Sequence, residues 1–407
     1  MVVEQLKIAM LSVHSCPLGN PGTKDTGGMS VYIRELAQEL AAQGLLVDVY
    51  TRVHDSEDAQ IIELGQTARL IHLRAGEDGY IHKLVVYSYL PDFACNVENF
   101  RKRNSMRYDL VFSHYWLSGW AGKYLAQWWD VPHVVMFHTL GAVKNSVGIG
   151  EDEPELRTKT ERLLARDCHR IIAASEREKE DLIQHYSASP EGISVVPCGV
   201  NLNLFQPMDK KIAKQQLGFD RDKVILFVGR IEPLKGIDQL LRAMPYLKNS
   251  HRSRLVIVGD GEYGQYEMER LQKLSQDLHI EDSITFSGLI KHEKLNHFYN
   301  AADVCVIPSY YESFGLVALE SMACGTPVVA TNVGDLKSIV QQGETGYVVM
   351  DNTPGVLASK IDLLLSKSSS DAEYMSSIRA SVTRFSWLNI AQEIIKTCRE
   401  VVASRFA

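Results

Sequence analysis

Short apolar runs alternate with amphipathic stretches along almost the whole chain, and this rhythm occurs twice. The runs predict strands at residues 7–13, 46–51, 68–73, 109–114, 133–138, 170–175 and 193–197, and again at 223–230, 254–260, 283–288, 303–309, 327–332 and 346–350. Helical patterns such as 29–44, which ends at a glycine, lie between several of them. Apolar strands separated by helices indicate parallel sheets covered on both faces. The sequence therefore predicts an α/β fold of doubly wound, Rossmann-like units.

A polar segment after Pro197, CGVNLNLFQPMDKK, interrupts this rhythm and predicts a boundary between two domains, 1–200 and 201–385. The length of 407 residues agrees, because one hydrophobic core serves roughly 100–200 residues. An amphipathic helix at 386–407 has no strand after it and could cap either domain; we expect it to complete the first. In two such domains, ligands are expected in a cleft at the carboxyl ends of the strands.

Composition excludes several other classes of protein. The net charge of −7 argues against a dedicated nucleic-acid binder. Seven scattered cysteines without a C-x-x-C pair argue against a disulfide framework or a zinc site and favour a reducing compartment. No apolar run approaches the roughly 18 residues of a membrane span, and the first apolar segment is too short for a signal peptide. We expect a cytoplasmic protein with no membrane span.

The first motif is the glycine-rich loop HSCPLGNPGTKDTGGMSVY, which follows the first predicted strand. Gly27 and Gly28 open onto a helix N-terminus, whose unpaired N–H groups favour an anion. The spacing is not G-x-G-x-x-G, and Thr51-Arg52 stands where a dinucleotide site would need an acidic ribose ligand. A nicotinamide enzyme is therefore disfavoured, and a glycine-rich turn without a ligand remains the alternative.

The second motif, FVGRIEPLKG, places Arg230 and Lys235 at the end of a predicted strand. Two cations there suit a diphosphate that becomes a leaving group, with Arg binding in bidentate fashion and Lys acting as a point charge. The alternative is a solvated loop with two ordinary charges.

The third motif, SYYESFGLVALE, contains Glu312 and Glu320, eight residues apart. Eight residues are slightly more than two helical turns, so both carboxylates are expected to face one cleft and accept hydrogen bonds from sugar hydroxyls. A helix N-terminus is expected at 313–316, where backbone N–H groups could hold phosphate oxygens. The alternative is a capped helix with one solvated Glu.

In combination, the three motifs resemble the GT-B retaining glycosyltransferases of family 4, whose C-terminal mark is an E-x7-E motif. The resemblance covers almost the whole chain and implies two Rossmann-like domains facing across a cleft. It implies a UDP-sugar co-substrate, with Arg230 and Lys235 binding its diphosphate, Glu312 the sugar hydroxyls and Glu320 the ribose. No cofactor and no metal are expected to be required, and no Asp-x-Asp clamp occurs. The donor-binding residues implied are Gly27, Gly28, Arg230, Lys235, Ile290, Glu312, Phe314, Gly315, Leu316 and Glu320.

The N-terminal half narrows the resemblance. The segments SVHSCPLGNPGTKDTGGMSVY, SHYWLSG and HTLGAVKN look most like the D-inositol-3-phosphate glycosyltransferases of mycothiol synthesis, with sucrose-phosphate synthases as near relatives. This resemblance implies transfer of N-acetylglucosamine or glucose to a phosphorylated polyol or sugar such as inositol 3-phosphate, and a homodimer. The acceptor ligands implied are His14, Lys83, Tyr115, Thr139 and Arg157, with Lys159 as an alternative to Arg157. The catalytic set implied is His138, Arg230, Lys235 and Glu312, with His138 helping to place the donor sugar.

Other functions on the same architecture stay open at this point. A sucrose-phosphate synthase would join UDP-glucose and fructose 6-phosphate. A nucleotide-sugar epimerase would need paired carboxylates for proton abstraction, and a glycogen-type phosphorylase would need a pocket for a lysine-bound cofactor. A sugar-binding protein without catalysis is disfavoured, because Glu312, Glu320, Arg230 and Lys235 are all present.

Overall fold

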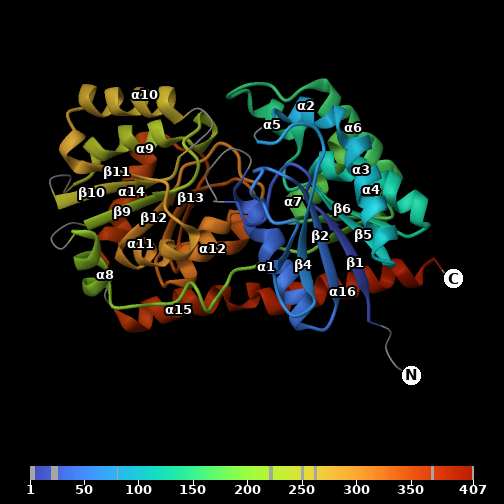
Figure 1. The fold of residues 1–407 in the computed structure, drawn as a ribbon. Coiled ribbons are helices and arrows are strands. Elements are labelled where there is room, and N and C mark those ends of the chain that lie inside the picture. Colours follow the sequence, from blue (N-terminus) through green and yellow to red (C-terminus); the bar gives the residue numbers. More distant parts are fainter. Residues whose placement is uncertain are drawn as a thin grey trace.

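The computed structural model describes residues 5–19, 26–79, 81–219, 223–248, 252–260, 264–367 and 371–405. Two sheets lie side by side (Figure 1), with strand orders β3-β4-β2-β1-β5-β6-β7-β8 and β11-β10-β9-β12-β13-β14. The first sheet contains β1 (Lys7–Leu11), β2 (Leu46–Arg52), β3 (Ile61–Glu63), β4 (Ala68–Leu73), β5 (Leu110–His114), β6 (His133–Met136), β7 (Arg170–Ala173) and β8 (Ile193–Val195). The second contains β9 (Lys223–Val228), β10 (Ser253–Val258), β11 (Ile284–Gly288), β12 (Val304–Ile307), β13 (Val328–Thr331) and β14 (Gly346–Val349).

Every strand pair in both sheets is parallel except β3 with β4, which is antiparallel. The predicted α/β fold of two Rossmann-like units is thus confirmed, with one addition. The strand β3 was not predicted; it is a three-residue edge strand whose side chains are exposed or half-buried.

Strand order reverses beside the first strand of each sheet, because β2 and β5 flank β1 while β10 and β12 flank β9. In open α/β sheets, ligands bind outside the carboxyl ends of the strands at such a reversal. His14 and Tyr115 follow β1 and β5, and Arg230 and Glu312 follow β9 and β12. Four predicted site residues therefore lie at the two positions that the topology favours for ligands.

Helices cover both faces of each sheet, because alternate residues of the strands are buried on opposite sides. On β1, Ile8 and Met10 pack into a core with α1 (Gly28–Ala42) and α16 (Trp387–Ala403), whereas Ala9 and Leu11 pack into a second core. That second core includes α3 (Leu90–Arg103), α4 (Tyr115–Trp129), α6 (Glu155–Asp167) and α7 (Glu176–Tyr186). The second sheet lies between α9 (Ile237–Ala243), α10 (Gly264–Asp277) and α14 (Pro354–Leu365) on one face and α11 (Leu295–Ala301), α12 (Leu316–Ala323) and α15 (Ala372–Val382) on the other.

The remaining helices are short. They are α2 (Lys83–Ser88), α5 (Gly141–Val147), α8 (Lys210–Leu217) and α13 (Leu336–Ile339).

The chain passes twice between the two sheets, at Val200 and at Ser386, and the two passes lie together. The Val200 amide donates to the Phe385 carbonyl at 2.8 Å, and Val200 and Ser386 form an isolated bridge. Beyond this crossing, α16 packs along α1, and Figure 1 shows it (red) lying beneath the first sheet while α15 lies beneath the second. The last helix therefore contributes its apolar side to the core of the N-terminal half.

All seven cysteines are free thiols. Within the described part of the chain, no helix is both long and apolar enough to cross a membrane. Among the same residues, no three His, Cys, Asp or Glu side chains gather as metal ligands would.

Candidate active site

The C-terminal half brings Lys235 and Glu312 into direct contact. The Lys235 Nζ lies 2.7 Å from Glu312 Oε1, and the Ser309 hydroxyl donates to the same oxygen at 2.7 Å. Gly236 makes this approach of two loops feasible: its φ is +64°, and a Cβ there would lie 2.2 Å from the Pro308 carbonyl oxygen. The loops after β9 and β12 therefore place one cation and one carboxylate side by side.

Arg230 lies on the same loop after β9 and is more open to solvent. Its guanidinium donates to Glu232 at 3.1 Å, and its side chain is 39% exposed. Ile290 is half-buried, whereas Phe314 is buried and its ring packs against Phe385. Only the backbone of Phe314 is therefore available to a ligand.

The Glu320 carboxylate is buried and held on both oxygens. The His292 Nε2 lies 2.7 Å from one oxygen, and the Tyr299 hydroxyl donates to the other at 2.7 Å. Burial lowers the pKa of His292, but the adjacent Glu320 carboxylate raises it more, so the pKa lies above its usual value. Each carboxylate oxygen of Glu320 keeps a second lone pair, so it can still accept a hydrogen bond from a ligand hydroxyl.

The predicted spacing of Glu312 and Glu320 along one helix is wrong. The helix α12 begins at Leu316, so Glu312 lies in the loop before it and the eight-residue interval does not consist of helical turns. The predicted helix N-terminus itself is present, with Gly315 as its cap at φ +120°.

Two helix N-termini face each other between the domains. Gly28 begins α1, and a Cβ at this position would lie 3.0 Å from Cδ1 of Leu316, the first residue of α12. Gly27 is the N-cap of α1. Loop residues 20–25, which belong to the first motif, lie outside the described residues. The partial positive charges of both helix N-termini thus lie close to each other, an arrangement that favours an anion.

On the N-terminal side, the predicted acceptor ligands cluster around Tyr115. The His14 and Tyr115 rings lie 4.4 Å apart, and the Arg157 guanidinium lies 4.8 Å from the Tyr115 ring. Burial, and to a smaller extent the positive charge of Lys83, holds the pKa of His14 well below its usual value. Lys83 therefore also lies near His14. Tyr115 has φ +77°, a conformation that is uncommon for a non-glycine residue.

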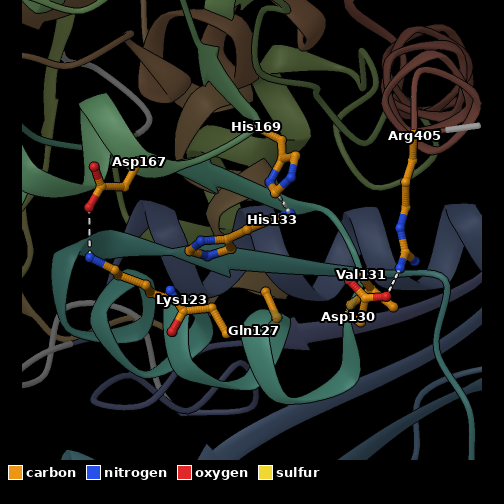
Figure 2. Close-up of a pocket in the computed structure, with 9 residues that line it drawn as sticks. Lys123, Gln127, Asp130, Val131, His133, Asp167, His169 and Arg405 are labelled. Carbon is orange, nitrogen blue, oxygen red and sulfur yellow. Dashed lines mark hydrogen bonds and ion pairs between the residues drawn. The ribbon is translucent and has the colours of Figure 1, made fainter. Parts of the chain in front are cut away.

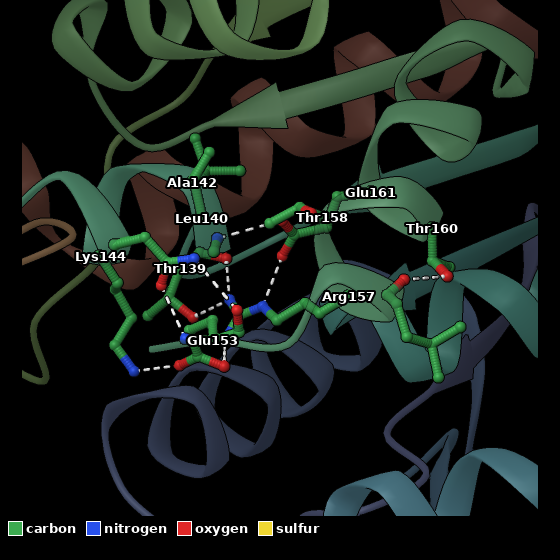
Figure 3. A network of polar contacts seen from close by, with 12 residues as sticks. Thr139, Leu140, Ala142, Lys144, Glu153, Arg157, Thr158, Thr160 and Glu161 are labelled. Atoms are coloured by element: carbon green, nitrogen blue, oxygen red, sulfur yellow. Dashed lines mark hydrogen bonds and ion pairs between the residues drawn. The ribbon is translucent and has the colours of Figure 1, made fainter. Parts of the chain in front are cut away.

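Arg157 is fully engaged within the protein, as Figure 3 shows. Its Nε donates to Glu161 at 2.7 Å, and one terminal nitrogen lies 2.9 Å from Glu153. The other terminal nitrogen donates to the Thr139 carbonyl and hydroxyl at 2.8 and 2.9 Å. Burial opposes the charge, but the pKa of Arg157 is raised well above its usual value by Tyr115 and the two carboxylates. The predicted phosphate ligand is therefore a buried cation with internal counter-charges.

Lys159, the alternative to Arg157, is not part of this group. It lies on the solvent side of α6, 63% exposed, and pairs with Glu155 at 2.9 Å. Sequence reasoning missed Lys144, Glu153 and Glu161. A signal was present for the two glutamates, because each lies four residues from Arg157.

His138 lies just beyond the end of β6 in a left-handed conformation, with φ +61°. Its Nε2 lies 2.9 Å from Nδ1 of His114, the last residue of β5, and Tyr32 packs edge-on against its ring. Burial lowers the pKa of His138 to about 3, so the ring is neutral and suited to hydrogen bonding. This geometry agrees with a positioning role for His138.

The two halves of the site touch. The Leu140 amide donates to the Tyr311 hydroxyl at 3.3 Å, which joins the loop after β6 to the loop that contains Glu312. Arg34 of α1 lies 3.4 Å from Nδ1 of His292, the histidine that holds Glu320. Residues predicted to bind donor and acceptor therefore line one region between the domains.

A separate cavity of about 410 Å³ lies at the amino ends of strands in the first sheet, near His133, the first residue of β6. Figure 2 shows its charged side chains paired with one another, Lys123 with Asp167 and Arg405 with Asp130. None of the predicted site residues lines this cavity.

Both halves of the chain match models of known families. Residues 26–204 match "Glycosyltransferase Family 4", and residues 209–380 match "Glycosyl transferases group 1". A D-inositol 3-phosphate glycosyltransferase of Streptomyces scabiei is 42% identical over 363 residues, which are 86% of this chain and 81% of that protein. One from Corynebacterium jeikeium is 37% identical over 97% of both chains. The chain belongs to glycosyltransferase family 4.

One solved structure agrees with this assignment, and a second agrees with the fold. Sucrose-phosphate synthase from Thermosynechococcus elongatus is 34% identical, with a TM-score of 0.89 over 98% of this chain and all of that one. Anabaena HepE in complex with UDP and glucose has a TM-score of 0.77 over 97% of this chain and all of that one, and at 20% identity it supports the fold alone. The family 4 chain is thus a glycosyltransferase with the GT-B architecture that the resemblance implied.

Proposed function

We propose that this glycosyltransferase moves a sugar, N-acetylglucosamine or glucose, from a UDP donor to a phosphorylated polyol or sugar such as inositol 3-phosphate, with retention of configuration. One observation supports this most: the Tyr311–Leu140 contact joins the Lys235–Glu312 pair to the Arg157–Thr139 group across the domain boundary. A diphosphate site and a phosphate site then lie against each other. Relatives at 37–42% identity are named for an inositol phosphate acceptor, which supports the same assignment.

The chemistry requires stabilisation of charge on the leaving diphosphate. In a front-face displacement, the bond between the sugar's anomeric carbon and the phosphate oxygen breaks while the acceptor oxygen bonds to the same face. The acceptor's hydroxyl proton goes to the departing phosphate oxygen, and UDP leaves. Lys235 has three N–H donors, so it can hold a phosphate oxygen while it remains paired with Glu312. Arg230 and the two helix N-termini would add to that stabilisation, the largest kind of catalytic contribution.

Measurement of UDP release over a panel of UDP-sugars and acceptors tests this proposal. We expect turnover with inositol 3-phosphate and little with inositol itself. Tight UDP binding without turnover on any pair would contradict the proposal and favour a sugar-binding protein.

A second candidate is a sucrose-phosphate synthase, since a protein of that name is 34% identical over nearly the whole chain. The same panel separates the two, because this candidate would use fructose 6-phosphate with UDP-glucose. We further propose a reducing compartment, which the seven free thiols support. The homodimer implied by the resemblance stays a prediction.

A further inference from the structure

The Glu153 carboxylate bridges two cations in the acceptor half of the site. One oxygen pairs with Lys144 and the other lies 2.9 Å from Arg157 (Figure 3). The Asn145 side chain makes two hydrogen bonds to the backbone of Glu153. The Glu153 amide donates to Asn145 Oδ1 at 2.7 Å, and Asn145 Nδ2 donates to the Glu153 carbonyl at 3.0 Å. The loop before α6 is thus fixed so that this carboxylate reaches both cations.

The second carboxylate on Arg157 has a different character. Glu161 is completely buried and also accepts hydrogen bonds from the Gly141 amide at 3.0 Å and the Tyr186 hydroxyl at 2.5 Å. By contrast, the Glu153 side chain is 16% exposed, and its hydrogen-bond and ion-pair partners are Lys144 and Arg157. Glu161 is therefore a fixed part of the fold, whereas Glu153 is the carboxylate that another anion could replace.

The charges of the group cancel. Lys144 and Arg157 supply two positive charges, and Glu153 and Glu161 supply two negative ones. A phosphate added beside them would meet an already neutral and mostly buried group, which costs free energy unless an internal anion leaves. A phosphate monoester carries about −1.5 to −2 at pH 7, so exchange of Glu153 for the phosphate offsets about one of its charges and reduces that cost.

We propose that Lys144 and Arg157 form the cation pair that binds the acceptor's phosphate, and that Glu153 occupies this pair in the free protein. The inference deepens the proposed function, since it rests on an acceptor that has a phosphate group. It adds Lys144, which the sequence did not single out, to the acceptor site. In this proposal Glu153 competes with every anion for the same two cations. It therefore lowers the affinity for each anion by the same factor.

The ionisation of Glu153 indicates that another anion displaces it from Lys144 and Arg157, and that its own protonation does not release it. Burial raises the pKa of Glu153, but Arg157 and Lys144 lower it more, to about 2. The carboxylate is therefore charged at any working pH, and only a competing anion removes it from the cations.

Binding of inorganic phosphate to the full chain, measured by calorimetry without donor or acceptor, tests the proposal. Glu153→Gln should bind phosphate about tenfold more tightly than wild type, the lower end of what a close charge pair contributes. Lys144→Met in the Glu153→Gln background should remove that gain. Glu155→Gln is the matched control on the same segment, because Glu155 is 78% exposed, and its affinity should equal that of wild type.

Two results overturn the proposal: phosphate binding by Glu153→Gln that is no tighter than by wild type, or a double variant that binds as tightly as Glu153→Gln alone. Should Glu153→Gln fail to fold, Glu153→Asp makes the same test. Its shorter carboxylate retains the charge but reaches the cations less well, and an unchanged affinity there also overturns the proposal. The measurement needs no turnover, so tighter phosphate binding with no transfer on any acceptor would count against the proposed function alone.

Discussion

Replacement of Arg157 by Met should destabilise the N-terminal domain far more than replacement of a comparable arginine. Met retains the length of the aliphatic stem but removes the charge that faces Glu161, whose side chain has no exposure. Lys144 remains as a partner for Glu153, so Glu161 is the carboxylate that loses its counter-charge. It retains the Gly141 and Tyr186 hydrogen bonds, which do not neutralise it.

Breaking a buried ion pair on one side costs about 3–5 kcal/mol, because the remaining charge stays buried without compensation. A domain of this size loses about 2–4 °C in Tm for each kcal/mol, so a decrease of about 10 °C is expected. The effect should reverse when the orphaned charge is removed as well. Arg157→Met combined with Glu161→Gln should therefore recover more than half of the lost stability.

Thermal unfolding followed by circular dichroism measures this prediction. Arg162→Met is the matched control, because Arg162 lies on the same helix, is exposed, and makes a single 3.3 Å contact with the His185 carbonyl. A Tm for Arg157→Met within about 2 °C of that control, the range of ordinary surface changes, would refute the assignment of Arg157 as a buried structural cation.

Three further variants test other parts of the molecule. Lys235→Met should reduce kcat/KM by about 10²–10³, as loss of an oxyanion donor does, and an unchanged UDP-release rate would contradict its role at the diphosphate. Thr139→Val leaves Arg157 in place but removes one of its hydrogen bonds, so KM for a phosphorylated acceptor should increase about tenfold. An equal increase for the unphosphorylated acceptor would argue against a phosphate contact. Burial raises the pKa of Glu178 from 4.5 to about 7, so the native state binds more protons than the unfolded chain in that range and stability decreases as pH rises through it. Glu178→Gln should remove this decrease, worth about 3 kcal/mol at most, and should melt above wild type at pH 8; equal melting temperatures there would contradict the assignment.

The fold could be predicted from the sequence because buried parallel strands have a strong apolar signature. The exception, β3, shows why: its residues Ile61–Glu63 pair on one side only and stay exposed or half-buried, so no buried run marks them. Helix α1 shows a related limit. Its apolar pattern predicts a helix from Met29, whereas it begins at Gly28, because a glycine adds nothing to the apolar pattern from which the start was predicted.

The position of a candidate site residue was predictable where the residue follows a strand and less so where its partners are distant in the sequence. His14 and Glu312 follow β1 and β12, so topology alone brings them to the carboxyl edge of a sheet. The interval between Glu312 and Glu320 misled, because helical geometry was applied to residues before the helix start. His292 holds Glu320 from 28 residues away, and no local pattern predicts such a contact.

The cations of the candidate site share one property, which explains how a chain of negative net charge can offer a site for phosphorylated ligands. Lys235 pairs with Glu312, Arg230 with Glu232, and Arg157 with two carboxylates. Each of these three cations is matched by a carboxylate before any substrate binds, whatever the sign of the whole chain. Binding of the acceptor's phosphate to Lys144 and Arg157 would displace Glu153, which offsets about one of the phosphate's charges, so few counterions are released from these two cations. Affinity for a phosphorylated acceptor should therefore depend only weakly on salt concentration, in contrast to the steep dependence of an uncompensated basic surface.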